Sequence, residues 1–303
     1  FHTVRDLVAR EDIDAVSVVV RVPKHHELVV AALDAGKHVF SEWPLGANLA
    51  EAEEMATRAR RAGVVTAVGL QGRHDPSLNY IRQLHAEGWL GRIVAVNVTM
   101  MGGGALAHSS ADAWMGVKAN GANLLTIVGG HTLDVISYCL KPFADLSASV
   151  ATQVPEWRLS DTGETIPVDA PDSLIVNGVL DGGAMVSLHA ASVPYNATGW
   201  RMEIYGTEGT IVASTSGLPQ ITPIALSGAQ GSDSLEELVL PPGLIDRFPG
   251  GPAGNVGRAY QHFAEAIRAG QSFSPDFAHA ESVHRLLDLI EQSSVEGRSV
   301  SVS

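Results

Sequence analysis

The first third of the chain alternates apolar, β-branched runs with helical segments, and this alternation restricts the fold more than any other feature. Each helical segment is bounded by a glycine or a capping side chain, which fixes its ends. The predicted strands cover residues 13–22, 37–40 and 64–68, and the predicted helices cover residues 26–35, 49–62 and 76–87. Strands separated by helices at this rhythm indicate a parallel sheet with crossover helices.

The pattern changes near residue 92, where we place a domain boundary between residues 1–92 and residues 93–303. Most later segments read as strands, with a hairpin turn at residues 181–183. The predicted strands cover residues 93–101, 146–154, 173–180, 184–190, 201–205 and 210–213, and the predicted helices cover residues 123–140, 254–269 and 276–294. Residues 214–251 are rich in Gly, Pro and Ser and read as loops. We therefore expect half of a doubly wound α/β domain, followed by an α+β domain whose mainly antiparallel sheet packs on a long helix.

Charge and cysteine content exclude several classes of function. The 303 residues carry 20 Lys and Arg against 33 Asp and Glu, a formal net charge of −13. A chain this acidic repels phosphate backbones, so we expect neither nucleic acid nor a membrane as a partner. The single cysteine, Cys139, excludes an internal disulfide and a thiolate zinc cluster, and it fits a cytoplasmic location. The histidines show no metal-ligand spacing on a helix, so we predict no metal.

Several segments in register resemble the Gfo/Idh/MocA oxidoreductases, and together they cover nearly the whole chain. The matching segments are residues 22–25 (VPKH), 31–39 (AALDAGKHV), 41–46 (SEWPLG), 129–134 (GGHTLD), 205–210 (YGTEGT) and 293–300 (SSVEGRSV). Within this family, residues 70–73 (LQGR) and 130–134 are most similar to the Gal80-like branch. The resemblance implies a Rossmann-type dinucleotide-binding domain, with NAD or NADP as cofactor, followed by a domain for substrate binding and dimerisation.

Two departures from the family pattern bear on function. The family's Gly-x-Gly-x-x-Gly turn, which holds the pyrophosphate at a helix N-terminus, has no counterpart: residues 102–104 are glycines but open no helix. We therefore expect the natural protein to be longer at its N-terminus. The family's Glu-Lys-Pro lysine, which contacts substrate and nicotinamide, is replaced by Trp43, whose indole has no titratable proton near neutrality. Ile127 stands where many relatives have an aspartate.

His131 and Asp134 are the candidate catalytic residues. Their spacing on one helix lets both side chains point the same way, and a histidine suits the removal of a hydroxyl proton during hydride transfer. Asp134 would orient the imidazole ring or hold the substrate. The alternative interpretation is an ordinary buried histidine that follows a Gly-Gly kink.

The candidate cofactor-binding residues follow the ends of predicted strands, where open α/β sheets bind ligands. They are Pro23, His25, Glu42, Trp43, Gln71 and Arg73. Arg73 would meet a phosphate or a carboxylate, and the alternative for it is a surface ion pair with Asp75. Trp114 and Lys118, in the loop before the long helix, are candidates for substrate contact.

These features predict an NAD(P)-dependent oxidoreductase that acts on a sugar, a polyol or a related small hydroxy compound, and that forms a dimer or tetramer. The alternative is a Gal80-like regulatory protein that binds NAD(P) without catalysis. Loss of the lysine favours the regulator, whereas retention of His131 and Asp134 favours the enzyme.

Overall fold

Three short parallel strands form the first sheet, in the order β1-β2-β3, as the alternating pattern predicts. The computed structural model describes residues 3–248 and 250–302. The strands are β1 Ala15–Val18, β2 His38–Glu42 and β3 Thr66–Gly69, and the helices around them are α1 Val4–Val8, α2 His25–Asp34 and α3 Leu49–Ala62. The first strand is shorter than predicted: it ends at Val18, and Pro23 lies in a 3-10 turn at Val22–Lys24 that leads into α2.

The second sheet has nine strands in the order β13-β12-β11-β10-β4-β9-β8-β5-β14. Its pairings are antiparallel except for that of β4 with β9, which confirms the predicted mainly antiparallel sheet. The strands are β4 Ile93–Gly102, β5 Phe143–Ala151, β8 Ser173–Leu180, β9 Met185–Ser192, β10 Gly199–Gly206, β11 Gly209–Thr215, β12 Ala225–Gln230, β13 Glu236–Glu237 and β14 Val300–Ser301. A separate ribbon pairs β6 Glu156–Arg158 with β7 Thr165–Pro167.

The prediction that residues 214–251 form only loops is wrong, because β12 and β13 lie within them. β12 is a run of mostly small residues that carries little strand propensity of its own. Every residue of β12 pairs with β11, so the neighbouring strand supplies the order that its own composition lacks.

The long apolar helix predicted over residues 123–140 is two helices of different type. Asn123 caps a π-helix at Leu124–Gly129, and the α-helix α5 Gly130–Cys139 continues from it. The change of helical type falls at the two consecutive glycines. Short π-helical segments occur frequently at functional sites.

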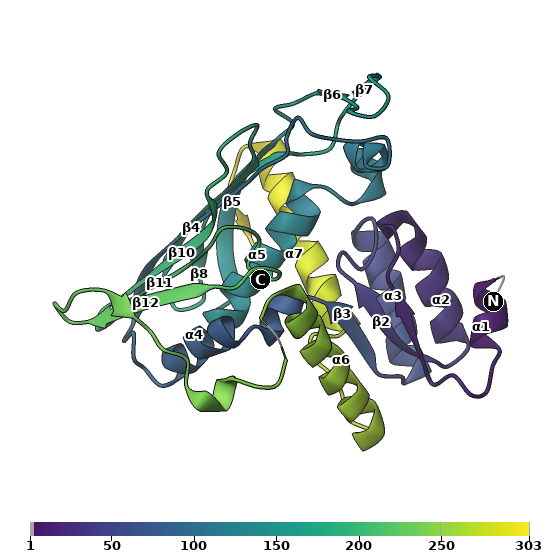
Figure 1. Cartoon of the computed structure of the whole chain (residues 1–303), viewed down its shortest axis with the longest axis horizontal. Coiled ribbons are helices and arrows are strands. Elements are labelled where there is room, and N and C mark those ends of the chain that lie inside the picture. Colours follow the sequence, from purple (N-terminus) through teal and green to yellow (C-terminus); the bar gives the residue numbers. More distant parts are fainter. Residues whose placement is uncertain (1–2, 249, 303) are drawn as a thin grey trace.

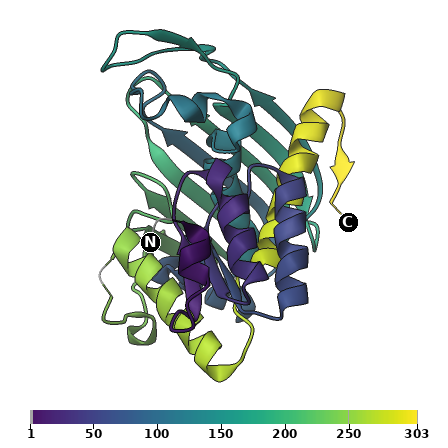
Figure 2. The ribbon, with the colours of Figure 1, turned by 90° about the vertical axis from the view of Figure 1, so that its right-hand side faces the viewer.

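The remaining helices connect the two sheets (Figure 1). They are α4 Pro76–Ala86, α6 Pro252–Ala269 and α7 Phe277–Glu296. Helix α7 packs against both α3 and β5, and α6 covers β3 with a small cluster that includes Phe40 and Phe263. Figure 2 shows α2 and α3 standing in front of the large sheet, with α7 beside them.

One apolar core runs through both sheets, from Val16 and Val39 to Leu188 and Trp200. None of the helices in the described ranges is long and apolar enough to span a bilayer. Within residues 3–248 and 250–302, no group of three or more His, Cys, Asp or Glu side chains is arranged to hold a metal ion.

Candidate active site

The carboxyl ends of β2 and β3 bring Glu42 and Gln71 together. Gln71 Nε2 donates a hydrogen bond of 2.6 Å to Glu42 Oε2. Burial raises the pKa of Glu42 to about 6, and the bond from Gln71 opposes that rise only in part. Gln71 Oε1 is buried without a hydrogen-bond partner in the described part of the chain. The pair therefore presents a carboxylate and a spare amide oxygen to a ligand with hydroxyl or amide donors.

Trp43 follows β2 and joins the parallel sheet to the beginning of α5. Its indole Nε1 donates a 2.8 Å hydrogen bond to the carbonyl oxygen of Thr126, and the side chain is only 6% exposed. Gly130 is the point of closest approach, since a Cβ there would lie 2.6 Å from the indole nitrogen. The ring of His284, on α7, lies 4.7 Å from that of Trp43. Trp43 is thus a packed wall directly beside the residue that precedes His131.

His25 holds the loop that carries Trp43. Its ring nitrogens lie 2.9 Å from two carbonyl oxygens, Nδ1 from that of Pro44 and Nε2 from that of Val20. His25 is almost fully buried, and Pro23 lies in the turn just before it. These contacts tie the loop after β1 to the loop after β2 and so position the backbone of both loops; a contact of His25 with the cofactor stays a prediction.

His131 lies in the first turn of α5, in the region where the strand ends meet the helix. The side chain is buried, and burial lowers its pKa to about 4 although the nearby charge of Asp134 opposes this. The imidazole is therefore neutral at physiological pH, and burial opposes its protonation. No carboxylate bonds to the ring among the described residues.

Asp134 binds Arg73 and His279 instead of the His131 ring. Arg73 donates from Nε and Nη2 to the carboxylate, at 3.0 and 2.7 Å, and His279 Nε2 lies 2.7 Å from Asp134 Oδ1. Burial opposes ionisation of Asp134, but the bonds from His279 and Arg73 outweigh it and hold the pKa of that carboxyl below its usual range. This buried cluster joins the end of β3, the middle of α5 and the start of α7.

The alternative interpretation of Arg73, an ion pair with Asp75, is wrong. Asp75 caps α4 by accepting hydrogen bonds from the backbone N–H groups of Ser77 and Leu78. It also accepts a bond from Asn255 on α6. The Asp75 carboxylate therefore takes its hydrogen bonds from the N-terminus of α4 and from Asn255, and Arg73 pairs with Asp134 instead.

The two proposed substrate contacts lie in the loop before the π-helix, each with a partner from another element. The guanidinium of Arg21 lies 5.3 Å from the centre of the Trp114 ring, which joins that loop to the loop after β1. Lys118 forms a 2.9 Å ion pair with Glu291 on α7 and lines a cavity of about 390 Å³ together with Asp288. Their assignment to substrate stays a prediction.

Sequence reasoning missed three residues that complete this arrangement: Thr126, His279 and His284. Thr126 contributes only a backbone oxygen, so no side-chain pattern could have revealed it. The two histidines lie in the first two turns of α7, and their partners are 145 or more residues away in the sequence. A helix near the C-terminus gives no local sign that it will reach the end of a parallel sheet.

Two family models match the chain. The model described as the oxidoreductase family with an NAD-binding Rossmann fold matches residues 1–70, and the model of the Gal80p C-terminal domain matches residues 76–215. The first match ends at residue 70 and the second begins at residue 76, directly after β3, the last strand of the parallel sheet. The two parts of the chain are therefore a Rossmann-type domain and a mostly antiparallel-sheet domain.

Individual relatives include both enzymes and a regulator. Dehydrogenase aclE of Aspergillus oryzae is 37% identical over 59% of this chain and 50% of its own length. The galactose/lactose metabolism regulatory protein GAL80 of Saccharomyces cerevisiae is 26% identical over 100% of this chain and 81% of its own length. The structure of levoglucosan dehydrogenase in complex with NADH and L-sorbose matches with a TM-score of 0.90 and 25% identity, over 100% of this chain and 83% of that one.

Proposed function

Because the chain belongs to the Gfo/Idh/MocA oxidoreductase family and has Gal80-like relatives, we propose that it is an NAD(P)-dependent oxidoreductase acting on a sugar, a polyol or a related small hydroxy compound. One observation carries the proposal: His131 lies in the first turn of α5, directly after Gly130, which packs against Trp43 at the carboxyl end of β2. Levoglucosan dehydrogenase, a structural relative, is a dehydrogenase that was solved with NADH and a sugar.

His131 is the group that moves the hydroxyl proton. Oxidation of an alcohol carbon removes a hydride and a proton, and the neutral imidazole has the free lone pair that the proton needs. Asp134 is a positioning residue, because its two oxygens are bonded to Arg73 and His279. Those bonds fix the second turn of α5 against the parallel sheet and so fix the first turn, which carries His131.

The residues at the strand ends fit a nicotinamide nucleotide. Glu42 offers a carboxylate and Gln71 a buried, unpartnered oxygen, both of which accept hydrogen bonds from ribose hydroxyl groups. The bound cofactor supplies the hydride acceptor or donor. Trp43 forms a wall of the pocket and excludes water, and its N–H is already bonded to Thr126, so it takes no part in proton transfer.

A Gal80-like regulator is the second candidate, and the bond between Trp43 and Thr126 favours it. The family's lysine at this position contacts substrate and nicotinamide, and here an indole that is packed and hydrogen-bonded takes its place. A protein of this kind would bind the dinucleotide and a protein partner without turnover. The homo-oligomeric state and the cytoplasmic location are predictions for either candidate.

The test measures dinucleotide binding and turnover separately. Isothermal titration calorimetry with NAD+ and NADP+ asks whether the chain binds a cofactor. A spectrophotometric screen with levoglucosan, sorbose, aldoses and polyols then asks whether it reduces that cofactor. We expect turnover that His131→Asn abolishes while cofactor binding survives. Cofactor binding without turnover on any substrate supports the regulator, and turnover that His131→Asn leaves unchanged overturns the role of His131.

A further inference from the structure

A cavity of about 650 Å³ lies between α4, α5, α6 and the segment around residue 244, and it shares Arg73 with the candidate active site. Such a volume falls in the range of small-molecule sites. Its charged and hydrogen-bonding lining residues are Arg73, Arg82, Arg258, His74, His262, Asp246, Asn79, Ser137, Tyr138 and Ser274. Three arginines and one carboxylate make this lining positive, although the chain as a whole carries a net charge of −13.

Arg82 and Arg73 lie over the same aromatic ring. Each guanidinium carbon is 4.7 Å from the centre of the Tyr138 ring, and Arg82 Nη1 donates a 3.2 Å hydrogen bond to the Tyr138 hydroxyl. That hydroxyl in turn donates to Asn79 Oδ1 at 2.6 Å. Arg73 has a carboxylate partner in Asp134, whereas Arg82 forms no ion pair with any described residue. Arg82 is thus a positive charge held in place at the cavity with donors to spare.

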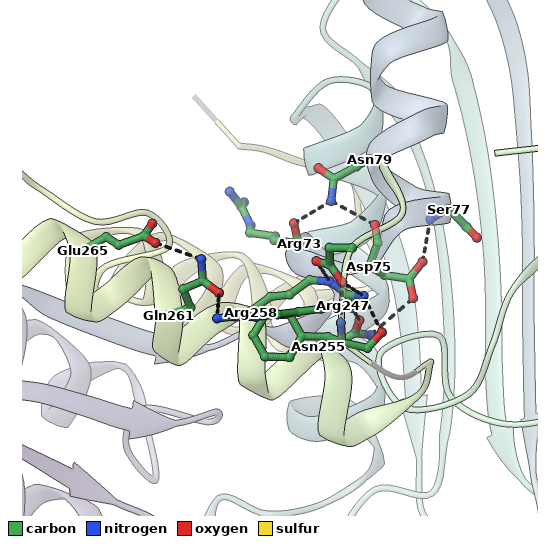
Figure 3. A network of polar contacts seen from close by, with 11 residues as sticks. Arg73, Asp75, Ser77, Asn79, Arg247, Asn255, Arg258, Gln261 and Glu265 are labelled. Carbon is green, nitrogen blue, oxygen red and sulfur yellow. Dashed lines mark hydrogen bonds and ion pairs between the residues drawn. The ribbon is translucent and has the colours of Figure 1, made fainter. Parts of the chain in front are cut away.

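Arg258 shows how the cavity receives a carboxylate. Figure 3 shows its guanidinium on α6, close to Asn255 and to the start of α4. Arg258 Nε and Nη2 form a two-pronged pair with Asp246 at 2.6 and 2.8 Å, and Nη1 bonds Asn255. Asp246 comes from an irregular segment, and its side chain is 40% exposed. One oxyanion of the chain itself therefore already occupies part of this basic lining.

His74 provides a second, independent sign of a ligand. The residue is only 8% exposed, yet its ring Nε2 is buried without a hydrogen-bond partner in the described ranges. Burial is the main reason why the pKa of His74 falls to about 4, and the positive charges of His262, Arg73 and Arg258 lower it further. A buried polar atom without a hydrogen-bond partner destabilises the fold. A negatively charged ligand supplies a partner for such an atom, and the nearby arginines stabilise the charge of that ligand.

We propose that this cavity binds a small metabolite bearing a phosphate or carboxylate group, held by the guanidinium groups of Arg82 and Arg73 beside the Tyr138 ring. The anion accepts charge-assisted hydrogen bonds from the guanidinium donors that the chain leaves unused. The cavity shares Arg73 with the cluster around Asp134, but neither Glu42 nor Gln71 lines it, and anion binding there does not require turnover. It touches α5 at Ser137 and Tyr138, one turn beyond Asp134.

The experiment is calorimetry with inorganic phosphate and with citrate, at constant ionic strength maintained with chloride. It compares the unmodified chain with Arg82→Gln and with Arg61→Gln, which removes the same charge from the exposed face of α3. We expect saturable binding of at least one anion, weakened about tenfold by Arg82→Gln, the loss of one charge-assisted hydrogen bond. Arg61→Gln is expected to leave it unchanged, and Tyr138→Phe to weaken it less.

Binding of phosphate alone assigns the site to phosphorylated metabolites, and binding of citrate alone assigns it to carboxylates. The proposal is overturned if neither anion binds saturably, or if both arginine variants weaken binding equally. Far-ultraviolet circular dichroism of each variant checks that α4 remains folded.

Discussion

The indole N–H of Trp43 donates a hydrogen bond to the carbonyl oxygen of Thr126, 83 residues further along the chain. This bond fastens the loop after β2 to the π-helix that leads into α5. The residue that replaces the family's lysine is therefore part of the contact between the two domains, and three of the four predictions below concern that contact.

Replacing Trp43 by Phe removes the donor but keeps most of the ring. The half-buried carbonyl of Thr126 then loses the indole donor, and we expect the free energy of unfolding to fall by about 1 kcal/mol. Trp43→Ala also removes the packing against Gly130 and is expected to cost about 3–5 kcal/mol. Chemical denaturation monitored by circular dichroism measures both. Equal stability of Trp43→Phe and the unmodified chain would show that the hydrogen bond does not form in solution.

Gly130→Ala places a methyl group where no space exists. Its Cβ would lie 2.6 Å from the Trp43 ring, so either the ring or the first turn of α5 must move, at a cost of about 1–3 kcal/mol. Since His131 is the next residue, we also expect turnover to fall more than cofactor binding. Gly243→Ala is the control, because a Cβ there meets nothing within 4 Å. Similar effects of the two substitutions would contradict the close contact.

Asp134→Asn leaves Arg73 buried without a carboxylate. Asp134 is 2% exposed and Arg73 12%, so the unpaired charge is expected to cost about 3–5 kcal/mol of folding stability. The double variant Arg73→Met with Asp134→Leu removes both charges and should recover part of the loss. Arg58→Gln breaks an exposed pair with Asp34 and should leave the unfolding midpoint nearly unchanged. If Asp134→Asn is as stable as the unmodified chain, the buried ion pair between Arg73 and Asp134 does not stabilise the fold as described.

Folding stability should decline as the pH falls from 6.5 towards 4. Burial lowers the pKa of His74, His131 and His284 to about 4, against an ordinary value of 6.5. Between these values the unfolded chain binds protons that the folded chain does not, so each histidine removes about 1.4 kcal/mol per pH unit. Glu42 acts in the opposite sense, because its raised pKa of about 6 adds stability as the pH falls towards 4.5.

Urea denaturation at a series of pH values measures that slope. His284→Gln should flatten it by the share of one histidine, whereas His189→Gln, at an exposed position of β9, should not change it. A slope that is the same in all three proteins would mean that His284 titrates normally in the folded state.

The sequence by itself determined the local structure and the register of the functional residues. Alternation of apolar runs with helical segments fixed the parallel order of β1, β2 and β3, because crossover helices allow no other direction. The strand-end positions of Glu42 and Gln71 followed from the same pattern, and so did the placement of His131 after a glycine pair. The main element that the pattern missed was β12, whose small residues carry a weak local signal.

Only the tertiary structure decided which of these residues meet. Arg73 and Asp134 are 61 residues apart, and Asp134 and His279 are 145 apart. Periodicity specifies which face of an element is buried, but not which other element covers it. The sequence therefore left Asp134 as a partner of His131 or of the substrate, and Arg73 as a ligand contact or a partner of Asp75. The packing of α5 and α7 against the end of the parallel sheet places Asp134 beside Arg73 and His279, because a buried carboxylate needs the opposite charge and the hydrogen-bond donors that only the fold brings to it.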